Sequence, residues 1–222
     1  MTEASLTTFM TEVVAQGTER RLALWMLKED PFFRRLPPER YSEAIDFALH
    51  AGQTAAGTAT SQYGRKPLDM AAALQVSVNR SDEVPRAEKT VLFSEYSDRP
   101  PTITLYTPSI VEVNILIREN GLAELLGVSD IEHVYLTHEL YHHLEAKKLI
   151  TGTAGFRIRT LSLGPLRLST GLPSLGEIAA DCFASVILRL RVPPKALQLP
   201  TIYRYNPEYA WKLLEEIKKS PA

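Results

Sequence analysis

Cysteine is almost absent from this chain, since Cys182 is the one cysteine among 222 residues. An intramolecular disulfide is therefore excluded, and so is a structural zinc site built from several cysteines. The fold has to be stabilised by buried apolar side chains, and a chain of this length can bury a sizeable core.

Long apolar runs are also missing. No stretch reaches the roughly 18 apolar residues that a membrane-spanning helix needs. Residues 1–16 mix Thr and Glu with apolar residues and lack the basic start and apolar run of a signal peptide. We therefore expect a cytoplasmic protein with no membrane partner.

A marked excess of charge is lacking as well. The chain has 25 Lys and Arg against 26 Asp and Glu, a net charge of −1. No predicted helix-turn-helix has a basic face, so we expect no direct contact with nucleic acid. The hydrophobic fraction of 45% and the charged fraction of 23% are those of an ordinary globular protein.

The sequence does contain an H-E-x-x-H motif, His138-Glu139-Leu140-Tyr141-His142, within a predicted helix from about Asp130 to Leu149. Two histidines four residues apart project from one helix face and can bind a single zinc ion. The Glu between them is placed to act as a base toward a water molecule. Ser129 and Glu132 fit a capping box that would begin this helix.

A catalytic zinc site needs a third protein ligand and an open position. Cys182 is one candidate, but Glu177 is better placed because it opens a later predicted helix, and Asp181 follows it by one turn. Asp181 can then accept the N–H of a ligand imidazole and so orient that ligand. The alternative is that Ser174 and Glu177 form a capping box and Glu177 bonds only a backbone N–H.

The remaining patterns predict an α+β fold, mostly helical, with a small three-stranded antiparallel or mixed sheet. A hairpin or irregular loop over the site is expected at 156–169, broken at Gly164-Pro165. The predicted helices are 4–28, 37–60, 67–74, 108–117, 122–126, 172–191 and 206–219, and the predicted strands are 75–79, 90–96 and 102–107.

Arginines alternate with apolar residues in the segment 156–169, at Arg157, Arg159 and Arg167. They are able to bind an acidic or carboxylate-bearing substrate. The pattern alone favours the simpler interpretation, in which they form the solvated face of a strand.

Together, the H-E-x-x-H motif and Glu177-Ile178-Ala179-Ala180-Asp181-Cys182-Phe183-Ala184 resemble the ImmA/IrrE-type zinc metallopeptidases and, more distantly, the gluzincins. The resemblance covers about Pro67 to Pro194. It implies a zincin-like domain whose sheet packs on the active-site helix. The implied zinc ligands are His138, His142 and Glu177, with Glu139 as catalytic base and Asp181 as the partner that hydrogen-bonds a ligand histidine. Tyr141 and Ala179 depart from the family pattern, which has Gly and a second Glu there.

We therefore expect a zinc-dependent metallopeptidase of narrow specificity toward a protein or peptide substrate, such as a transcriptional regulator. The alternatives are a non-proteolytic zinc-binding or protein-interaction module with a gluzincin-like fold, and a purely structural helix without metal. Candidates for the oxyanion donor or the rim of the site are Tyr203, Tyr205, His143 and the arginines of 157–167, although a surface position is the simpler interpretation of His143.

We divide the chain into an N-terminal helical annex, 1–64, and a zincin-like metallopeptidase domain, 65–222, which together can form one compact domain. The annex lies outside the family resemblance. We expect it to dock a partner or to form the surface of a homodimer.

Overall fold

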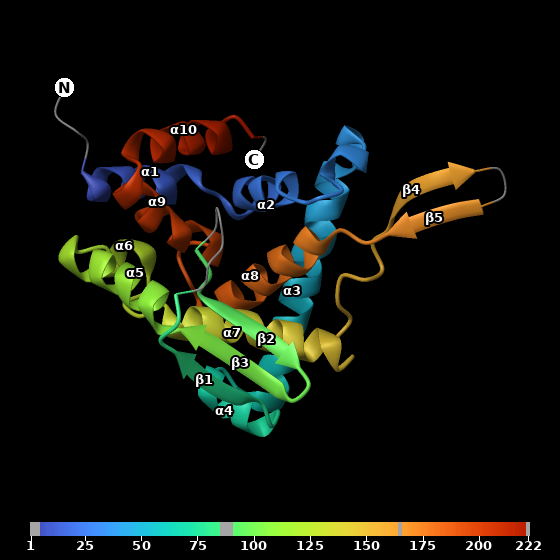
Figure 1. Ribbon diagram of the computed structural model, residues 1–222, viewed down its shortest axis with the longest axis horizontal. Helices are drawn as coiled ribbons and strands as arrows, with labels where there is room; N and C mark the ends of the chain where they lie inside the picture. The colour runs from blue at the N-terminus through green and yellow to red at the C-terminus, as the bar shows by residue number, and fades with distance from the viewer. Residues whose placement is uncertain (1–4, 85–90, 164–165, 221–222) are drawn as a thin grey trace.

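The computed structural model describes residues 5–84, 91–163 and 166–220, with the backbone alone for 160–163 and 166–168. The fold is mostly helical with a small mixed sheet, which confirms the predicted α+β class (Figure 1). The α-helices are α1 (Leu6–Gln16), α2 (Glu19–Lys28), α3 (Tyr41–Tyr63), α4 (Pro67–Ala73), α5 (Thr107–Glu119), α6 (Ala123–Leu126), α7 (Glu132–Ala146), α8 (Pro173–Leu188), α9 (Leu199–Tyr205) and α10 (Pro207–Lys218). The 3-10 helices are η1 (Phe33–Arg35), η2 (Pro38–Arg40) and η3 (Pro194–Gln198).

The predicted helix 4–28 is two helices, because the chain breaks at Gly17. A Cβ atom at Gly17 would lie 2.6 Å from the carbonyl oxygen of Val13, so the tight turn at this position requires glycine. Thr18 then caps α2, since its hydroxyl accepts the backbone N–H of Arg21. The break lets α1 and α2 pack at different places on the core.

The sheet consists of β1 (Ser77–Ser81), β3 (Pro101–Tyr106) and β2 (Ser94–Asp98), in that spatial order. The central strand β3 pairs parallel with β1 and antiparallel with β2, so the sheet is mixed. Ile103 and Leu105 on β3 are fully buried, as alternate residues facing the core should be. Strand β2 begins later than the predicted 90–96, and Thr90 lies outside the described residues.

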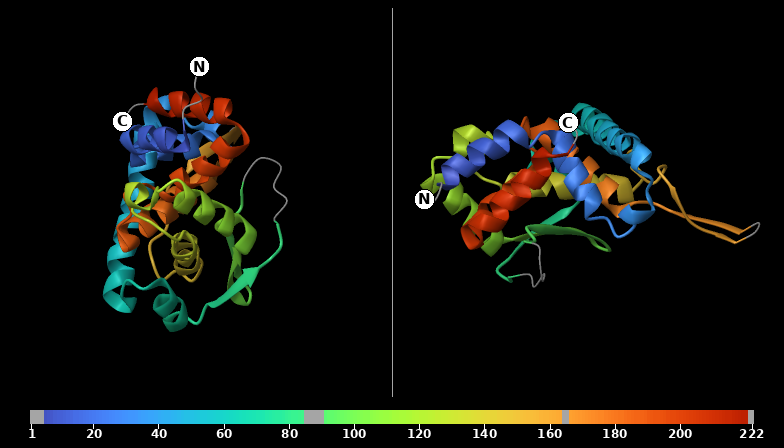
Figure 2. Two further views of the ribbon diagram at one scale, coloured as in Figure 1. Left: turned by 90° about the vertical axis from the view of Figure 1, so that its left-hand side faces the viewer. Right: turned by 90° about the horizontal axis from the view of Figure 1, so that it is seen from above.

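Helix α7 lies at the centre of the molecule. Viewed along its axis, the sheet lies on one side and α3 on the other (Figure 2). Its contacts with α8 and β2 bury almost every residue from Val134 to Leu144. The hydrophobic core is one cluster that includes residues of both 1–64 and 65–222. The division of the chain into an annex and a domain stays a prediction.

The start of α7 differs from the predicted Ser129 capping box. Instead, the carboxylate of Asp130 accepts the backbone N–H of Glu132 at 2.9 Å. Asn114 of α5 donates to that carboxylate at 2.8 Å and accepts the N–H of Ile131 at 3.0 Å. The helix is thus begun by a side chain from another helix, which local sequence rules do not reveal.

The predicted hairpin forms from β4 (Ile158–Leu163) and β5 (Leu166–Thr170), but it extends away from the body of the protein rather than over the centre (Figures 1 and 2). The guanidinium of Arg157 donates to Ser169 within the hairpin, and Arg159 is exposed. These positions of Arg157 and Arg159 agree with the simpler interpretation, in which the arginines form the solvated face of a strand. Gly164-Pro165 and the Arg167 side chain lie outside the described residues. No helix in the described part of the chain is long and apolar enough to cross a membrane.

The contact between α3 and α8 depends on Gly52. A Cβ atom there would lie 2.4 Å from the carbonyl oxygen of Ala179 and 2.8 Å from Cβ of Cys182. We expect Gly52→Ala to lower the free energy of unfolding by about 1–3 kcal/mol, because the two helices must separate.

Gly57 is the matched control for Gly52, since it lies on the same helix with nothing within 4 Å of its Cβ position. Gly57→Ala should raise the free energy of unfolding by about 0.5–1 kcal/mol through helix propensity. Urea unfolding of the two variants measures both values. Equal effects of the two substitutions would show that α3 and α8 do not approach this closely.

Candidate metal centre

Three side chains from α7 and α8 converge on one point. His138 and His142 lie one turn apart on α7, and Glu177 lies in the first turns of α8. His138 Nε2 is 3.1 Å from Glu177 Oε2 and 3.2 Å from His142 Nε2, and His142 Nε2 is 3.4 Å from Glu177 Oε1. This cluster of two imidazoles and a carboxylate can hold a metal ion.

Asp181 orients the first histidine. Its Oδ1 accepts the Nδ1–H of His138 at 2.9 Å, and its Oδ2 accepts the backbone N–H of Lys195 at 2.9 Å. The neutral tautomer with its proton on Nδ1 leaves the Nε2 lone pair of His138 facing the cluster. Asp181 therefore has the geometry predicted for it, one turn after Glu177.

The alternative capping box does not form. Ser174 lies inside α8, and its backbone N–H donates to Asp30 Oδ2 at 2.9 Å, so a residue of the segment after α2 caps this helix. Glu177 instead directs its carboxylate to the two histidines and keeps 53% of its side-chain surface exposed. An open carboxylate next to two imidazoles is a suitable metal ligand.

Cys182 is not a third ligand. Its thiol donates to the carbonyl oxygen of Leu49 on α3 at 3.4 Å, on the side of α8 turned away from the histidines. Burial raises the pKa of the Cys182 thiol, so the sulfur stays protonated. Of the two candidates from the sequence, the structure brings Glu177 to the cluster.

The electrostatics of the cluster favour a positive charge at its centre. Burial acts to lower the pKa of His138, but hydrogen bonds to Asp181 and Glu177 outweigh it and hold the pKa well above the usual value. Burial likewise acts to raise the pKa of Glu177, while the hydrogen bonds and charges of His138 and His142 hold it well below its usual range. A metal cation satisfies the same preference by replacing the proton.

Glu139 is held by a residue that the sequence did not single out. The hydroxyl of Ser94, at the start of β2, donates to Glu139 Oε1 at 2.7 Å, and both side chains are buried. The bond fixes one carboxylate oxygen and leaves Oε2 without a bond to Ser94. Ser94 lies 45 residues before Glu139 and belongs to no sequence motif. Only the packing of β2 against α7 in the structure identifies it as the partner of Glu139.

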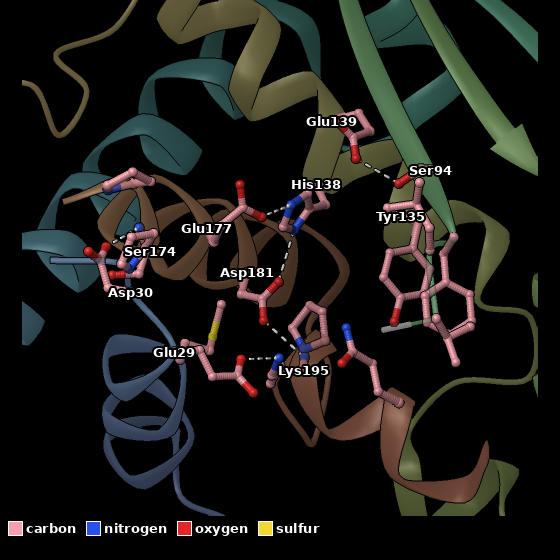
Figure 3. Close-up of a pocket in the computed structure, with 18 residues that line it drawn as sticks. Glu29, Asp30, Ser94, Tyr135, His138, Glu139, Ser174, Glu177, Asp181 and Lys195 are labelled. Carbon is pink, nitrogen blue, oxygen red and sulfur yellow. Dashed lines mark hydrogen bonds and ion pairs between the residues drawn. The ribbon is translucent and has the colours of Figure 1, made fainter. Parts of the chain in front are cut away.

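A cavity of about 320 Å³ opens beside the cluster (Figure 3). His138, Glu139 and Glu177 line it from one side, and the segment after α2 and the start of η3 close it from the other. Lys195 Nζ pairs with Glu29 at 2.9 Å and lies 4.3 Å from the centroid of the Trp25 ring. Residues before position 64 therefore form part of the cavity wall.

His143 is not a surface histidine, because it is only 3% exposed. Its Nδ1 lies 3.0 Å from the hydroxyl of Tyr96 on β2, and that hydroxyl lies 3.1 Å from Asp98. Burial and the charge of Lys147 lower the pKa of His143, and burial and Asp98 raise the pKa of Tyr96 to about 12. Both groups are thus neutral, and they fasten the edge strand to α7 instead of forming the cavity rim.

Tyr203 and Tyr205 are not brought to the cluster either. The buried residues of α9 are those of its first turn, and the ring of Tyr203 stacks on Phe9 of α1 at 4.9 Å between centroids. Tyr205 is 73% exposed, and a hydrogen bond to Glu112 raises its pKa. Neither tyrosine lines the cavity, so the structure does not support the predicted oxyanion role for them.

Comparison of the chain with protein-family models, with curated proteins and with solved structures finds no match. The ImmA/IrrE-type resemblance therefore stays a prediction. The assignment of a metal centre depends on the donor set and the geometry of His138, His142 and Glu177.

We expect Glu177→Ala to abolish stoichiometric metal binding, because only two of the three protein ligands, the imidazoles of His138 and His142, remain. Asp181→Asn should weaken binding about 10–100-fold, because the charge that orients His138 is lost. Competition with a chromophoric chelator measures both affinities.

Glu29→Gln is the control for these variants, since Glu29 lines the same cavity without contacting either histidine. It should bind metal as the wild type does. Equal losses in all three variants would point to unfolding, and an unchanged affinity in Glu177→Ala would remove Glu177 from the site.

Proposed function

We propose that this protein is a zinc-dependent metallopeptidase whose ligands are His138, His142 and Glu177. The observation that carries the proposal is the triangle of 3.1, 3.2 and 3.4 Å between their donor atoms. Zinc bonds of about 2.0–2.1 Å in a tetrahedral site separate neighbouring ligand atoms by about 3.3 Å. Three protein ligands leave the fourth position open, as in catalytic zinc sites.

Bound zinc would activate a water molecule by lowering its pKa toward about 7 and would polarise a substrate carbonyl. Glu139 is the general base in this proposal. It follows His138 directly, lines the same cavity as Glu177, and is oriented by the hydroxyl of Ser94. It takes a proton from the attacking water and returns it to the leaving amine.

The surroundings of the cluster support a peptide substrate. Strand β2 pairs with β3 on one side only, so its other edge remains available among the described strands, and an extended peptide can pair with such an edge. Ser94 and Tyr96 of β2 border the pocket that also includes Glu139, His142 and Glu177. A substrate chain on this edge would pass beside the base and the metal.

Narrow specificity is part of the proposal, because the cavity is closed on one side by the segment after α2. A cytoplasmic regulatory protein, such as a transcriptional regulator, is the substrate that the ImmA/IrrE-type resemblance implies. A zincin-like fold follows from the same resemblance. The alternative, a zinc-binding module that hydrolyses nothing, differs in one measurable respect, which is turnover.

The test is hydrolysis of a mixed peptide library by zinc-loaded protein, compared with Glu139→Gln. We expect the variant to keep its zinc and to lose about 10²–10⁴-fold in rate, because the base is removed while all ligands remain. Removal of zinc with a chelator should abolish cleavage, and added zinc should restore it.

Zinc bound without any cleavage by the wild type would favour the non-proteolytic module. Cleavage that survives in Glu139→Gln would exclude Glu139 as the base. Glu119→Gln is the matched control, since Glu119 is an exposed carboxylate on α5 that lines neither of these pockets, and it should keep both zinc and activity.

A further inference from the structure

Two buried hydroxyls without hydrogen-bond partners border the cavity beside the metal centre. Tyr135 is 6% exposed and Ser174 is 8% exposed, and neither side-chain oxygen has a partner within the described residues. An unsatisfied buried polar group is destabilising, so proteins seldom keep one without a use. The other unpartnered side-chain oxygens of the described chain do not line this cavity.

Tyr135 is rigidly placed. It lies one turn before His138 on the same face of α7, and its ring stacks on Phe93 at 4.3 Å between centroids with an angle of 12°. Its hydroxyl points away from Glu139, toward the part of the cavity that Asp181 and Lys195 border (Figure 3). Burial, with a smaller contribution from Asp181, raises the pKa of Tyr135, so the hydroxyl keeps its proton and can donate as well as accept.

The charged groups that face this part of the cavity are already paired. Asp30 accepts two backbone N–H groups, from Phe32 and Ser174. The two oxygens of Asp181 are occupied by His138 and Lys195, and Glu29 is paired with Lys195. An anionic ligand would find no unpaired lysine here, because Lys195 is already bound to Glu29, and a neutral polar group avoids that cost.

The rest of the cavity wall is largely apolar. Met26, Phe93 and Pro173 are among the lining residues, and a volume of about 320 Å³ accommodates a long side chain. A ligand group that fits both the wall and the hydroxyls has an apolar stem and a neutral hydrogen-bonding end.

We propose that this cavity is a specificity pocket for a neutral amide side chain of the substrate, glutamine or asparagine, and that the Tyr135 hydroxyl hydrogen-bonds the amide. The inference rests on the proposed zinc peptidase function and assigns the substrate residue that lies next to the metal centre. A pocket with a buried hydrogen-bonding group binds a side chain that can bond to this group more tightly than a side chain of the same size that cannot.

The probes are the α-hydroxamates of L-glutamine and L-methionine, because a hydroxamate binds zinc and the two side chains are nearly the same size. Isothermal titration of zinc-loaded protein measures binding without turnover. We expect the wild type to bind the glutamine probe at least about tenfold more tightly, in line with one good hydrogen bond. Tyr135→Phe should lose this preference and keep its zinc.

Tyr141→Phe is the matched control. Tyr141 is also buried on α7, and its hydroxyl has no partner among the residues that the structure describes, but it does not line the cavity. This variant should keep the wild-type preference. Thermal unfolding adds a readout independent of ligand, since Tyr135→Phe removes no protein hydrogen bond and should unfold no earlier than Tyr141→Phe.

Zinc binding with the same preference in wild type and Tyr135→Phe would overturn this inference and leave the peptidase proposal intact. A clearly lower unfolding temperature for Tyr135→Phe than for Tyr141→Phe would show that the hydroxyl is bonded within the protein, which also overturns it. Wild-type protein without zinc would overturn the proposed function and this inference together.

Discussion

The close packing of α8 between α7 and α3 is the constraint on which the rest of the structure depends. Ala179, Ala180 and Ala184 of α8 are fully buried, and the carbonyl of Ala179 lies where only a glycine on α3 leaves room. This contact sets the position of α8 relative to α7. Glu177 and Asp181, one turn apart, then meet His138 from two sides.

The same packing explains one departure from the ImmA/IrrE-type pattern. Position 179, where that pattern has a second Glu, is fully buried, and its backbone carbonyl lies against Gly52 of α3. A carboxylate there would be buried without a partner, at a cost of several kcal/mol. Glu177 is left as the proposed ligand carboxylate of α8, and the contact of α8 with α3, one of the N-terminal helices, is part of the reason.

The N-terminal segment contributes to the candidate site directly. Asp30 caps α8, and Met26 and Pro31 line the cavity beside it. Removal of the segment 1–64 would therefore open one wall of the cavity and release the start of the helix that carries Glu177. Its contribution to the site adds to any role in docking a partner.

The parts of the site that follow local periodicity could be predicted from the sequence. The helix repeat sets the spacing of His138 and His142 and that of Glu177 and Asp181. One motif on each helix was therefore sufficient to predict which side chains share a helix face. Ser94 and Lys195 could not be predicted, because strand pairing and the turn after α8 bring them in from distant positions.

Tertiary packing also decided the predictions that failed. Asn114 and Asp130 begin α7 in place of Ser129, and burial against β2 removed His143 from the surface. Tyr203 faces α1, and the β4–β5 hairpin extends away from the centre (Figure 1). Each of these placements depends on contacts between residues far apart in the sequence. Composition and turn residues therefore predicted the helices and strands but not how they pack.

The most direct test of the central claim is X-ray absorption at the zinc K-edge of purified, zinc-loaded protein. Coordination by His138, His142 and Glu177 predicts about four nitrogen and oxygen neighbours at about 2.0–2.1 Å, the scattering pattern of two imidazoles, and no sulfur. A sulfur neighbour at about 2.3 Å, a single imidazole, or a six-oxygen shell would contradict the site.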